Sequence, residues 1–174
     1  MKKAFLITAT LCLCTVAFAQ ETAKAGSRYE IKVNLTNALA LFPEVGFEYT
    51  LKDDLGLGLS LATALDNDLS YSVQFTPYFR FYFGSKPAKT FFIEANAALL
   101  GFREDSYSIS YDGYSTSVYS NSRKKTVTDF GLGFAVGYKF FNKKNFTGEI
   151  YGGLGRTFAD RVYPRVGIAV GKQF

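Results

Sequence analysis

Apolar and polar side chains alternate one by one along most of this 174-residue chain. In the segment 55–62, leucine stands at every second position, with glycine, serine or alanine between. In 71–83, aromatic residues and valine alternate with residues such as Thr76 and Arg80. A period of two indicates β-strands with one apolar face, whereas amphipathic helices show a period near 3.6. The pattern therefore predicts an all-β protein.

Eight segments of this kind follow one another, separated by polar turns. The predicted strands cover residues 28–39, 43–52, 55–62, 71–83, 90–102, 126–141, 146–158 and 164–174. Strands of about 9–11 residues cross a bilayer when they are tilted. An even number of such strands predicts an eight-stranded antiparallel up-and-down transmembrane barrel. Pro77 has no N–H to donate to its neighbours, so we expect a bulge or a lost ladder bond there.

A polar stretch, 103–125, separates the fifth and sixth predicted strands and is rich in serine and tyrosine. Alternation continues through it on both sides of Asp112-Gly113, a dipeptide typical of hairpin turns. Its tyrosines among the serines are Tyr107, Tyr111, Tyr114 and Tyr119. This mixture resembles adaptable binding surfaces, in which tyrosine supplies contact area and serine supplies hydrogen bonds. We expect a long hairpin that either binds an extracellular partner or is a solvated loop extension.

The first residues have the composition of a secretory signal peptide. Two lysines precede an apolar run, 4–16, and Ala17-Phe18-Ala19 matches the small-x-small pattern of a cleavage site. The run is shorter than the roughly 18–20 residues of a spanning helix, which disfavours the alternative of an N-terminal anchor. Both cysteines lie in this segment. The predicted organisation is therefore a signal peptide, 1–19, followed by a cysteine-free barrel, 20–174.

The apolar face of the predicted barrel has two alternative orientations. In a soluble lipocalin-like barrel it lines a ligand cavity, and in an outer-membrane barrel it faces lipid around a polar lumen. The other face carries glycine, alanine, serine and scattered charges, which suit the narrow interior of eight strands. Aromatic residues beside the short turns would form an interfacial girdle: Phe81, Tyr82, Phe83, Phe91, Phe92, Phe140, Phe141 and Phe146. Both features favour the membrane orientation.

Two segments, YSVQFTPYFRFYFG and DFGLGFAVGYKFF, resemble strands of the outer-membrane β-barrel-domain group. With its signal peptide, eight strands and terminal phenylalanine, the chain resembles the small OmpA/OmpX-like outer-membrane barrels. The resemblance implies that a C-terminal pattern assists recognition by the barrel insertion machinery. The matching positions are Val166, Ile168, Val170 and Phe174, while Lys172 departs from the pattern. The fold hosts adhesins and enzymes alike, so it does not specify a function.

In the membrane orientation, the phase of its strand points Arg80 into the lumen, and five other charged residues share this inward phase. The predicted lumen charge network is Glu48, Arg80, Glu94, Lys139, Glu149 and Arg165. A charge enclosed in a narrow barrel is costly unless it is paired. We therefore expect Arg80 to pair with one or more of the glutamates. The network either fills the lumen as a plug or forms a gated ion path.

Composition argues against catalysis. The chain contains no histidine, although small barrel enzymes of the outer membrane generally rely on a histidine base. Without histidine or mature cysteine, the best metal ligands are missing too. The chain carries 20 basic and 15 acidic side chains, a mild excess that does not indicate nucleic-acid binding. We expect no enzyme activity, no cofactor and no metal site.

Basic residues near the outer rim are expected to contact phosphates of the outer-leaflet glycolipid. They are Arg103, Arg123, Lys124, Lys125, Arg156 and Arg161. The sequence thus predicts a monomeric outer-membrane protein, surrounded by lipid and glycolipid, with a structural or surface-interaction role. A narrow channel or transporter is one alternative. A soluble lipocalin-like barrel that binds a small hydrophobic ligand is another.

Overall fold

The computed structural model describes residues 29–52, 54–66, 69–84, 89–112, 115–142 and 144–174. The side chains of Lys89 and of residues 104–112 and 115–125 are outside this description. The predicted signal peptide, 1–19, also lies outside the described residues.

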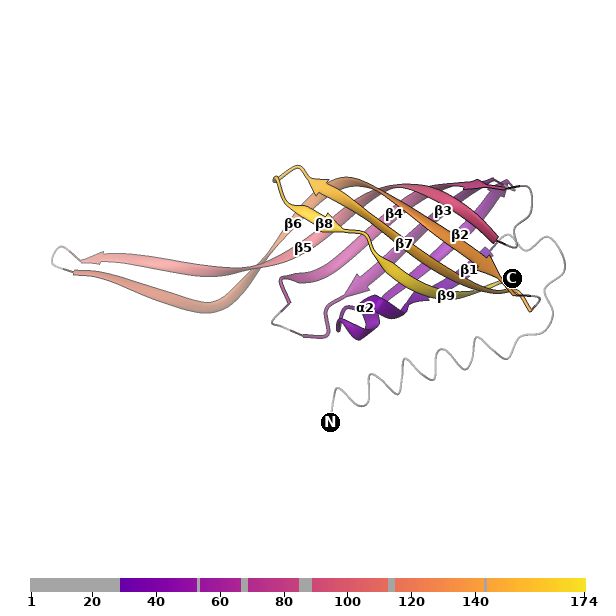
Figure 1. The fold of residues 1–174 in the computed structure, drawn as a ribbon. Coiled ribbons are helices and arrows are strands. Elements are labelled where there is room, and N and C mark those ends of the chain that lie inside the picture. The colour runs from indigo at the N-terminus through magenta and orange to yellow at the C-terminus, as the bar shows by residue number, and fades with distance from the viewer. Residues whose placement is uncertain (1–28, 53, 67–68, 85–88, 113–114, 143) are drawn as a thin grey trace, which may run out of the picture.

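The described residues form nine β-strands and one short helix. The strands are β1 (Tyr29–Asn34), β2 (Glu44–Lys52), β3 (Leu55–Thr63), β4 (Tyr71–Phe83), β5 (Lys89–Asp112), β6 (Ser115–Phe141), β7 (Phe146–Thr157), β8 (Val162–Pro164) and β9 (Gly167–Gln173). Neighbouring strands are antiparallel, and the pairings β1–β9 and β6–β7 close the sheet on itself. β8 and β9 pair with successive parts of β7, so together they form the eighth strand of the wall. The predicted eight-stranded up-and-down barrel is confirmed (Figure 1).

The first predicted strand, 28–39, is wrong in its second half. β1 ends at Asn34, and Leu35–Leu39 form the helix α2. The side-chain oxygen of Asn34 accepts a hydrogen bond from the backbone N–H of Asn37 at 3.3 Å. Asparagine is a preferred N-cap because its side chain satisfies an N–H that has no partner within the helix. This cap ends the strand, although the alternation of side chains continues for two further residues, Leu35 and Thr36.

Pro77 affects one ladder only. Pairing between β4 and β5 is missing at Thr76 and Pro77 and resumes in an unchanged register. The proline therefore removes a ladder contact without forming a bulge. The register shift between these two strands lies elsewhere, between Tyr71 and Val73.

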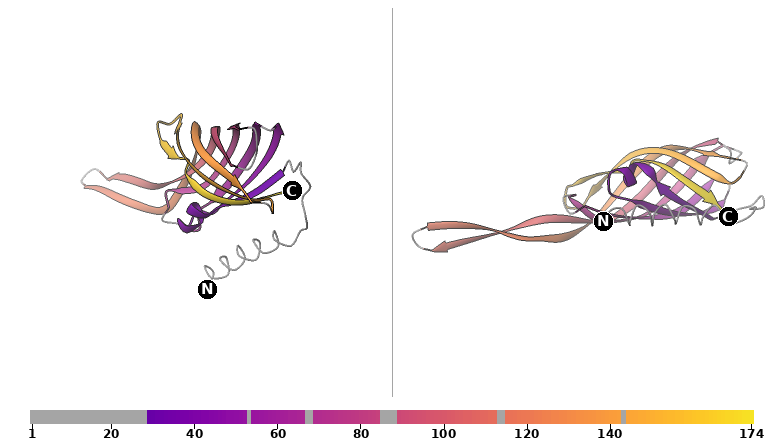
Figure 2. Two further views of the ribbon diagram at one scale, coloured as in Figure 1. Left: turned by 45° about the vertical axis from the view of Figure 1, so that its right-hand side comes forward. Right: turned by 90° about the horizontal axis from the view of Figure 1, so that it is seen from below.

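β5 and β6 extend beyond all other strands as a two-stranded ribbon. Their pairing runs as far as Asp112 and Ser115, with one register shift between Asp105 and Ser106. The ribbon projects from one end of the barrel, and β4 ends and β5 begins at the opposite end (Figures 1 and 2). The predicted polar insert, 103–125, forms the distal part of this ribbon.

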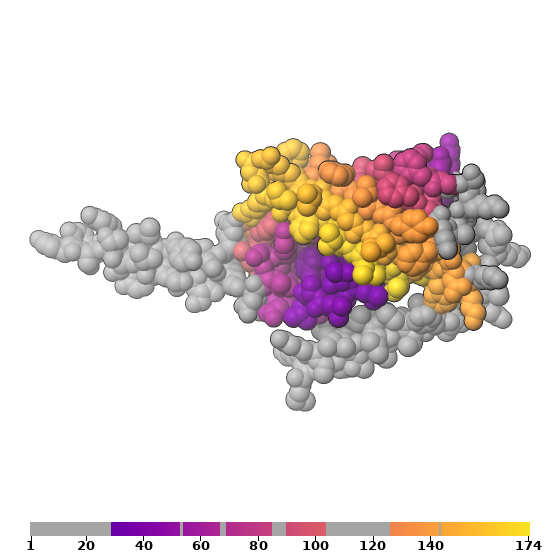
Figure 3. All heavy atoms as spheres, in the orientation of Figure 1, coloured from indigo at the N-terminus to yellow at the C-terminus, as the bar shows by residue number. Residues whose placement is uncertain are grey.

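The outer face of the wall is apolar and the inner face is polar. Along β3, the leucines point outward and the residues between them are buried. Leu57 of β3 and Leu132 of β6 are 50% and 55% exposed, whereas Arg80 of β4 is 1% exposed. Figure 3 shows the outer surface, on which indigo residues from the start of the chain lie against the yellow C-terminal strand. The soluble lipocalin-like barrel requires the reverse orientation.

The predicted aromatic girdle is wrong for Tyr82 and Phe92. Both are buried in the lumen, where their rings meet edge to face at 5.6 Å. Phe141 is a third exception, because it has the inward phase of Lys139, whose Nζ lies 5.4 Å from its ring. Phe81, Phe83 and other alternate aromatics at this end do point outward. Consecutive residues of a strand face opposite sides, so only every second member of an aromatic run can reach the outer surface.

Glycines give large rings room inside the narrow barrel. A Cβ added at Gly155 would lie 2.0 Å from the ring of Tyr163, and one at Gly58 would lie 2.3 Å from the ring of Tyr78. Atoms cannot approach so closely, so each ring occupies space that a side chain would need. The glycines of the alternating pattern therefore determine where the lumen accepts tyrosine.

Candidate functional site: the charged lumen

Arg80 stands at the centre of the lumen and contacts three carboxylates. Its Nε donates to Glu94 at 2.8 Å, and its NH1 donates to Glu149 at 2.8 Å and to Glu48 at 3.0 Å. The guanidinium lies 4.2 Å from the centroid of the Phe92 ring. The charge is thus held by hydrogen bonds and by a cation–π contact, as the burial of an arginine requires.

Lys32 and Lys139 contact two of these carboxylates, Glu48 and Glu149, on the side of the short turns. Lys32 donates to Glu48 at 2.7 Å and to Glu149 at 2.8 Å. Lys139 lies 3.2 Å from Glu48, 3.1 Å from Glu149 and 2.5 Å from Glu30. Each carboxylate therefore meets more than one cation, and the contacts form one connected network.

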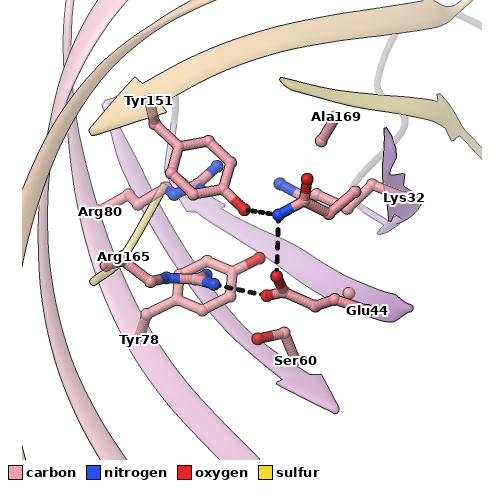
Figure 4. Close-up of a pocket in the computed structure, with 10 residues that line it drawn as sticks. Lys32, Glu44, Ser60, Tyr78, Arg80, Tyr151, Arg165 and Ala169 are labelled. Carbon is pink, nitrogen blue, oxygen red and sulfur yellow. Dashed lines mark hydrogen bonds and ion pairs between the residues drawn. The ribbon is translucent and has the colours of Figure 1, made fainter. Parts of the chain in front are cut away.

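Arg165 continues the network toward the ribbon end of the barrel. Its Nε donates to Glu94 at 2.9 Å, and its NH1 forms an ion pair with Glu44. Asn34 donates to Glu44 at 2.9 Å and to the hydroxyl of Tyr151 at 3.0 Å. Figure 4 shows the Arg165–Glu44 pair dashed, and it shows Tyr151 connected to Glu44 through the amide of Asn34. The polar atoms of this region bind one another.

The charged part of the lumen has little free space. One cavity there measures about 10 Å³ and lies among Lys32, Glu44, Ser60, Arg165 and neighbouring residues. A single water needs about 10–15 Å³. This cavity therefore has room for about one water molecule.

The ribbon end of the lumen is filled differently, by apolar side chains. Leu100, Phe102 and Tyr163 are buried there, together with Ala98. The hydroxyl of Tyr163 donates to Asn96 Oδ1 at 2.8 Å. An apolar layer thus lies on the ribbon side of the ionic network.

The structure brings together all six residues of the predicted lumen network, and it adds three that the prediction omitted. The added residues are Glu30, Lys32 and Glu44, which are 2%, 6% and 4% exposed. Each has the inward phase of its own strand, since Lys32 lies opposite Gly46 and Glu30 lies opposite Glu48. The alternation therefore contained the signal that identifies them.

Among the predicted rim residues, Arg103 is bound to the loop between β3 and β4. Its NH1 donates to the backbone carbonyl of Asp66 at 2.7 Å and to that of Leu69 at 3.3 Å. The side chain of Arg103 therefore points toward this loop and stabilises it. The side chains of residues 123–125, the basic run Arg123-Lys124-Lys125, lie outside the described part of the structure.

The other two rim arginines each have an acidic neighbour. Arg156 donates to Asp160 at 3.0 Å in an exposed ion pair. Arg161 lies 3.6 Å from the carboxylate of Asp129 and stacks over the ring of Phe102 at 4.5 Å. Arg161 thus lies beside the apolar layer of the lumen.

The residues of the predicted insertion pattern lie at the seam of the barrel. Val166, Ile168 and Val170 point outward and are 43–52% exposed. The backbone N–H of Phe174 donates to the carbonyl of Tyr29 at 2.8 Å. The last residue thus extends the ladder between β1 and β9, the first and last strands of the barrel.

Within the described ranges, no helix is long and apolar enough to cross a membrane. No group of three or more histidine, cysteine, aspartate or glutamate side chains among these residues is arranged to hold a metal ion. The lumen glutamates are instead bound by lysine and arginine.

Two solved structures have the same fold. The N-terminal β-barrel domain of Pseudomonas aeruginosa OprF shares 17% sequence identity, with a TM-score of 0.58 over 87% of this chain and 100% of that one. Neisserial surface protein A shares 12% identity, with a TM-score of 0.50 over 88% of this chain and 100% of that one. The predicted resemblance to small eight-stranded outer-membrane barrels is confirmed at the level of the fold.

Comparison with curated proteins gave no match. A family model described as "Protein of unknown function (DUF3575)" matches residues 6–169. This match covers nearly the whole chain. The protein therefore belongs to the DUF3575 family.

Proposed function

We propose that the protein is an integral barrel of the outer membrane, without catalytic activity, whose closed lumen supports a surface ribbon. One observation carries this proposal: ionised residues fill the inside of the barrel, while leucine, phenylalanine and valine cover the outside. Soluble monomers rarely expose an apolar patch larger than about 600 Å². The apolar outer face of this wall is suited to contact with lipid acyl chains.

The height of the apolar belt agrees with this environment. On β6, six outward residues from Phe130 to Phe140 are apolar or aromatic and 40–63% exposed. Ten residue steps of about 3.4 Å, tilted by about 45°, rise roughly 24 Å. The lipid-facing band of outer-membrane barrels is about 25 Å tall.

The ribbon of β5 and β6 is the proposed interaction element. β4 accompanies β5 only to Phe102, and β7 accompanies β6 only to Gly131. Beyond these residues, among the strands described, the ribbon has no strand neighbour on either edge. Such edges accept an extended segment of a partner, and the tyrosine-serine composition of 103–125 suits such contacts. The rim arginines would bind glycolipid phosphates beside it.

Membrane fractionation combined with a detergent gel tests the membrane assignment. We expect the protein in the outer-membrane fraction, and we expect its mobility on the gel to change on heating, because a folded barrel migrates differently from the unfolded chain. Recovery as a soluble protein, with no effect of heating on mobility, would contradict the proposal.

A narrow channel is the second candidate, because the ionised network continues along the lumen from Glu30 to Glu44. Planar-bilayer recordings separate the two. A plug predicts no channel events for the wild type or for Arg80→Lys, which keeps the charge. Conductance that rises in Arg80→Ala but not in Arg80→Lys indicates a gated path instead.

Deletion of residues 106–121, followed by separate assays of membrane insertion and ligand binding, tests the role of the ribbon.

A further inference from the structure

The short helix α2 has its polar and apolar sides reversed relative to a helix on a water-soluble protein. Surface helices of soluble proteins turn their apolar stripe toward the core and their polar face toward water. In α2, Leu39 is 87% exposed and Leu35 is 42% exposed, while Thr36 and Asn37 are directed at the protein. The helix lies on the outside of the wall beside β9 (Figures 1 and 3).

Hydrogen bonds hold the inner side of this segment against the barrel. The hydroxyl of Thr36 accepts the backbone N–H of Ile168 at 3.0 Å. Asn37 donates to Glu44 at 2.7 Å, and so connects the helix to the charged lumen. With this polar side fixed, the leucines cannot turn inward without breaking these contacts.

The backbone of the segment is also prepared for an environment without water. The carbonyls of residues 36–38 accept hydrogen bonds from the N–H groups of Ala40, Phe42 and Leu41, and the carbonyl of Leu41 accepts one from Leu65. The side chain of Asn34 caps the first turn. An unsatisfied backbone group in the hydrocarbon region costs several kcal/mol. A connection that satisfies these groups internally can lie among acyl chains.

We propose that α2 forms, with neighbouring residues, a lipid-contacting surface that lies in the acyl region of the bilayer rather than in water. The α2 surface consists of Leu35, Leu39, Leu41, Val166 and Ile168. Val166 and Ile168 lie at the start of β9 and belong to the apolar outer face, so the surface is continuous with the belt. This inference rests on the proposed membrane location. It adds that one inter-strand connection is part of the lipid-facing wall.

The absence of tryptophan from the chain provides a clean probe. Leu39→Trp introduces a single fluorophore at a position that makes few internal contacts, and heat-modifiable mobility on a gel verifies folding. The protein is reconstituted in phosphatidylcholine vesicles whose acyl chains carry bromine, a contact quencher. We expect Leu39→Trp to lose most of its emission, as Leu132→Trp in the middle of the belt does. Lys144→Trp, in the turn at the opposite end, should keep most of its emission.

The two reference variants separate the failure of this inference from that of the proposed function. If Leu132→Trp is not quenched, the barrel is not in the bilayer and both proposals fail. If Leu132→Trp is quenched but Leu39→Trp is not, the α2 surface alone is wrong. Leu39→Cys then identifies another occupant, because disulfide-linked dimers in vesicles would show that a second copy covers this surface.

Discussion

Phe79 and Arg80 are consecutive residues of β4, yet they have opposite surroundings. Phe79 is 41% exposed on the outer wall, and Arg80 is 1% exposed among three carboxylates. The contacts of Arg80 are directional and depend on particular partners. Those of Phe79 need only apolar surroundings and space. The inner face therefore requires specific residues, whereas the outer face requires only a class of residue.

The two faces differ because a substitution has a different free-energy cost on each. When one partner of a buried ion pair is removed, the other charge remains enclosed without compensation. An apolar substitution on the outer face changes only the amount of apolar area, worth about 25 cal/mol per Å². Substitutions on the two faces of the same strands therefore measure the difference directly.

Arg80→Ala should have the largest effect. It leaves Glu48, Glu94 and Glu149 in the lumen without their shared cation, and breaking a buried pair costs about 3–5 kcal/mol. We expect a loss of this size in the free energy of unfolding, measured by urea titration in lipid vesicles.

Arg156→Ala is the matched control for the loss of an arginine. Its ion pair with Asp160 is exposed, with 71% and 83% of the two side chains accessible. Exposed pairs contribute about 0–1 kcal/mol. Equal losses for the two variants would mean that the lumen network is not what stabilises the barrel.

Leu132→Arg tests the outer face. The side chain lies in the middle of the apolar stretch of β6 and is 55% exposed. A charge facing lipid near the midplane costs about 2–4 kcal/mol, and this cost falls to about 0–1 kcal/mol near the interface. We expect the larger loss for Leu132→Arg and the smaller one for Thr128→Arg, an outward residue nearer the ribbon. If both variants unfold at the wild-type urea concentration, the outer face does not contact lipid.

Gly153→Ala should destabilise the wall, because a Cβ at this position would lie 2.0 Å from the carbonyl oxygen of Phe134. Overpacking of this kind costs about 1–3 kcal/mol. Its neighbour is the control, since a Cβ at Gly152 would meet no atom within 4 Å. Gly152→Ala should therefore unfold at nearly the wild-type urea concentration. If Gly152→Ala lost more stability than Gly153→Ala, the assignment of the two environments would be refuted.

The sequence predicted the barrel and the orientation of its faces because both depend on a local property, the alternation of side chains. Arg80 and Glu94 were expected inside for this reason, and they pair directly at 2.8 Å. Glu30 and Lys32 share the same inward phase and were omitted, although the alternation of β1 contained the same information. The inward phase of their strand alone was sufficient to predict that these charges lie in the lumen.

Other features depend on contacts between distant segments, which periodicity does not describe. Arg165 and Glu44 pair across 121 positions of sequence, and this choice depends on how the closed wall staggers its strands. The helix at Leu35–Leu39 replaced a predicted strand because Asn34 caps it and Thr36 bonds to β9. The alternation holds as far as Thr36 and is interrupted at Asn37, but a period of two does not show that a helix begins there.

Tyr163→Phe should have the smallest effect, and it tests whether the apolar end of the lumen behaves like the ionic middle. The side chain is fully buried, and its hydroxyl donates to Asn96 Oδ1 at 2.8 Å. The ring fills the space beside Gly155 and is kept in the variant, so only one neutral hydrogen bond is lost. Such a bond contributes about 0.5–1.5 kcal/mol. A urea titration showing a loss as large as that of Arg80→Ala would mean that Tyr163 and Asn96 belong to the coupled ionic network, and the two layers of the lumen would then have to be treated as one.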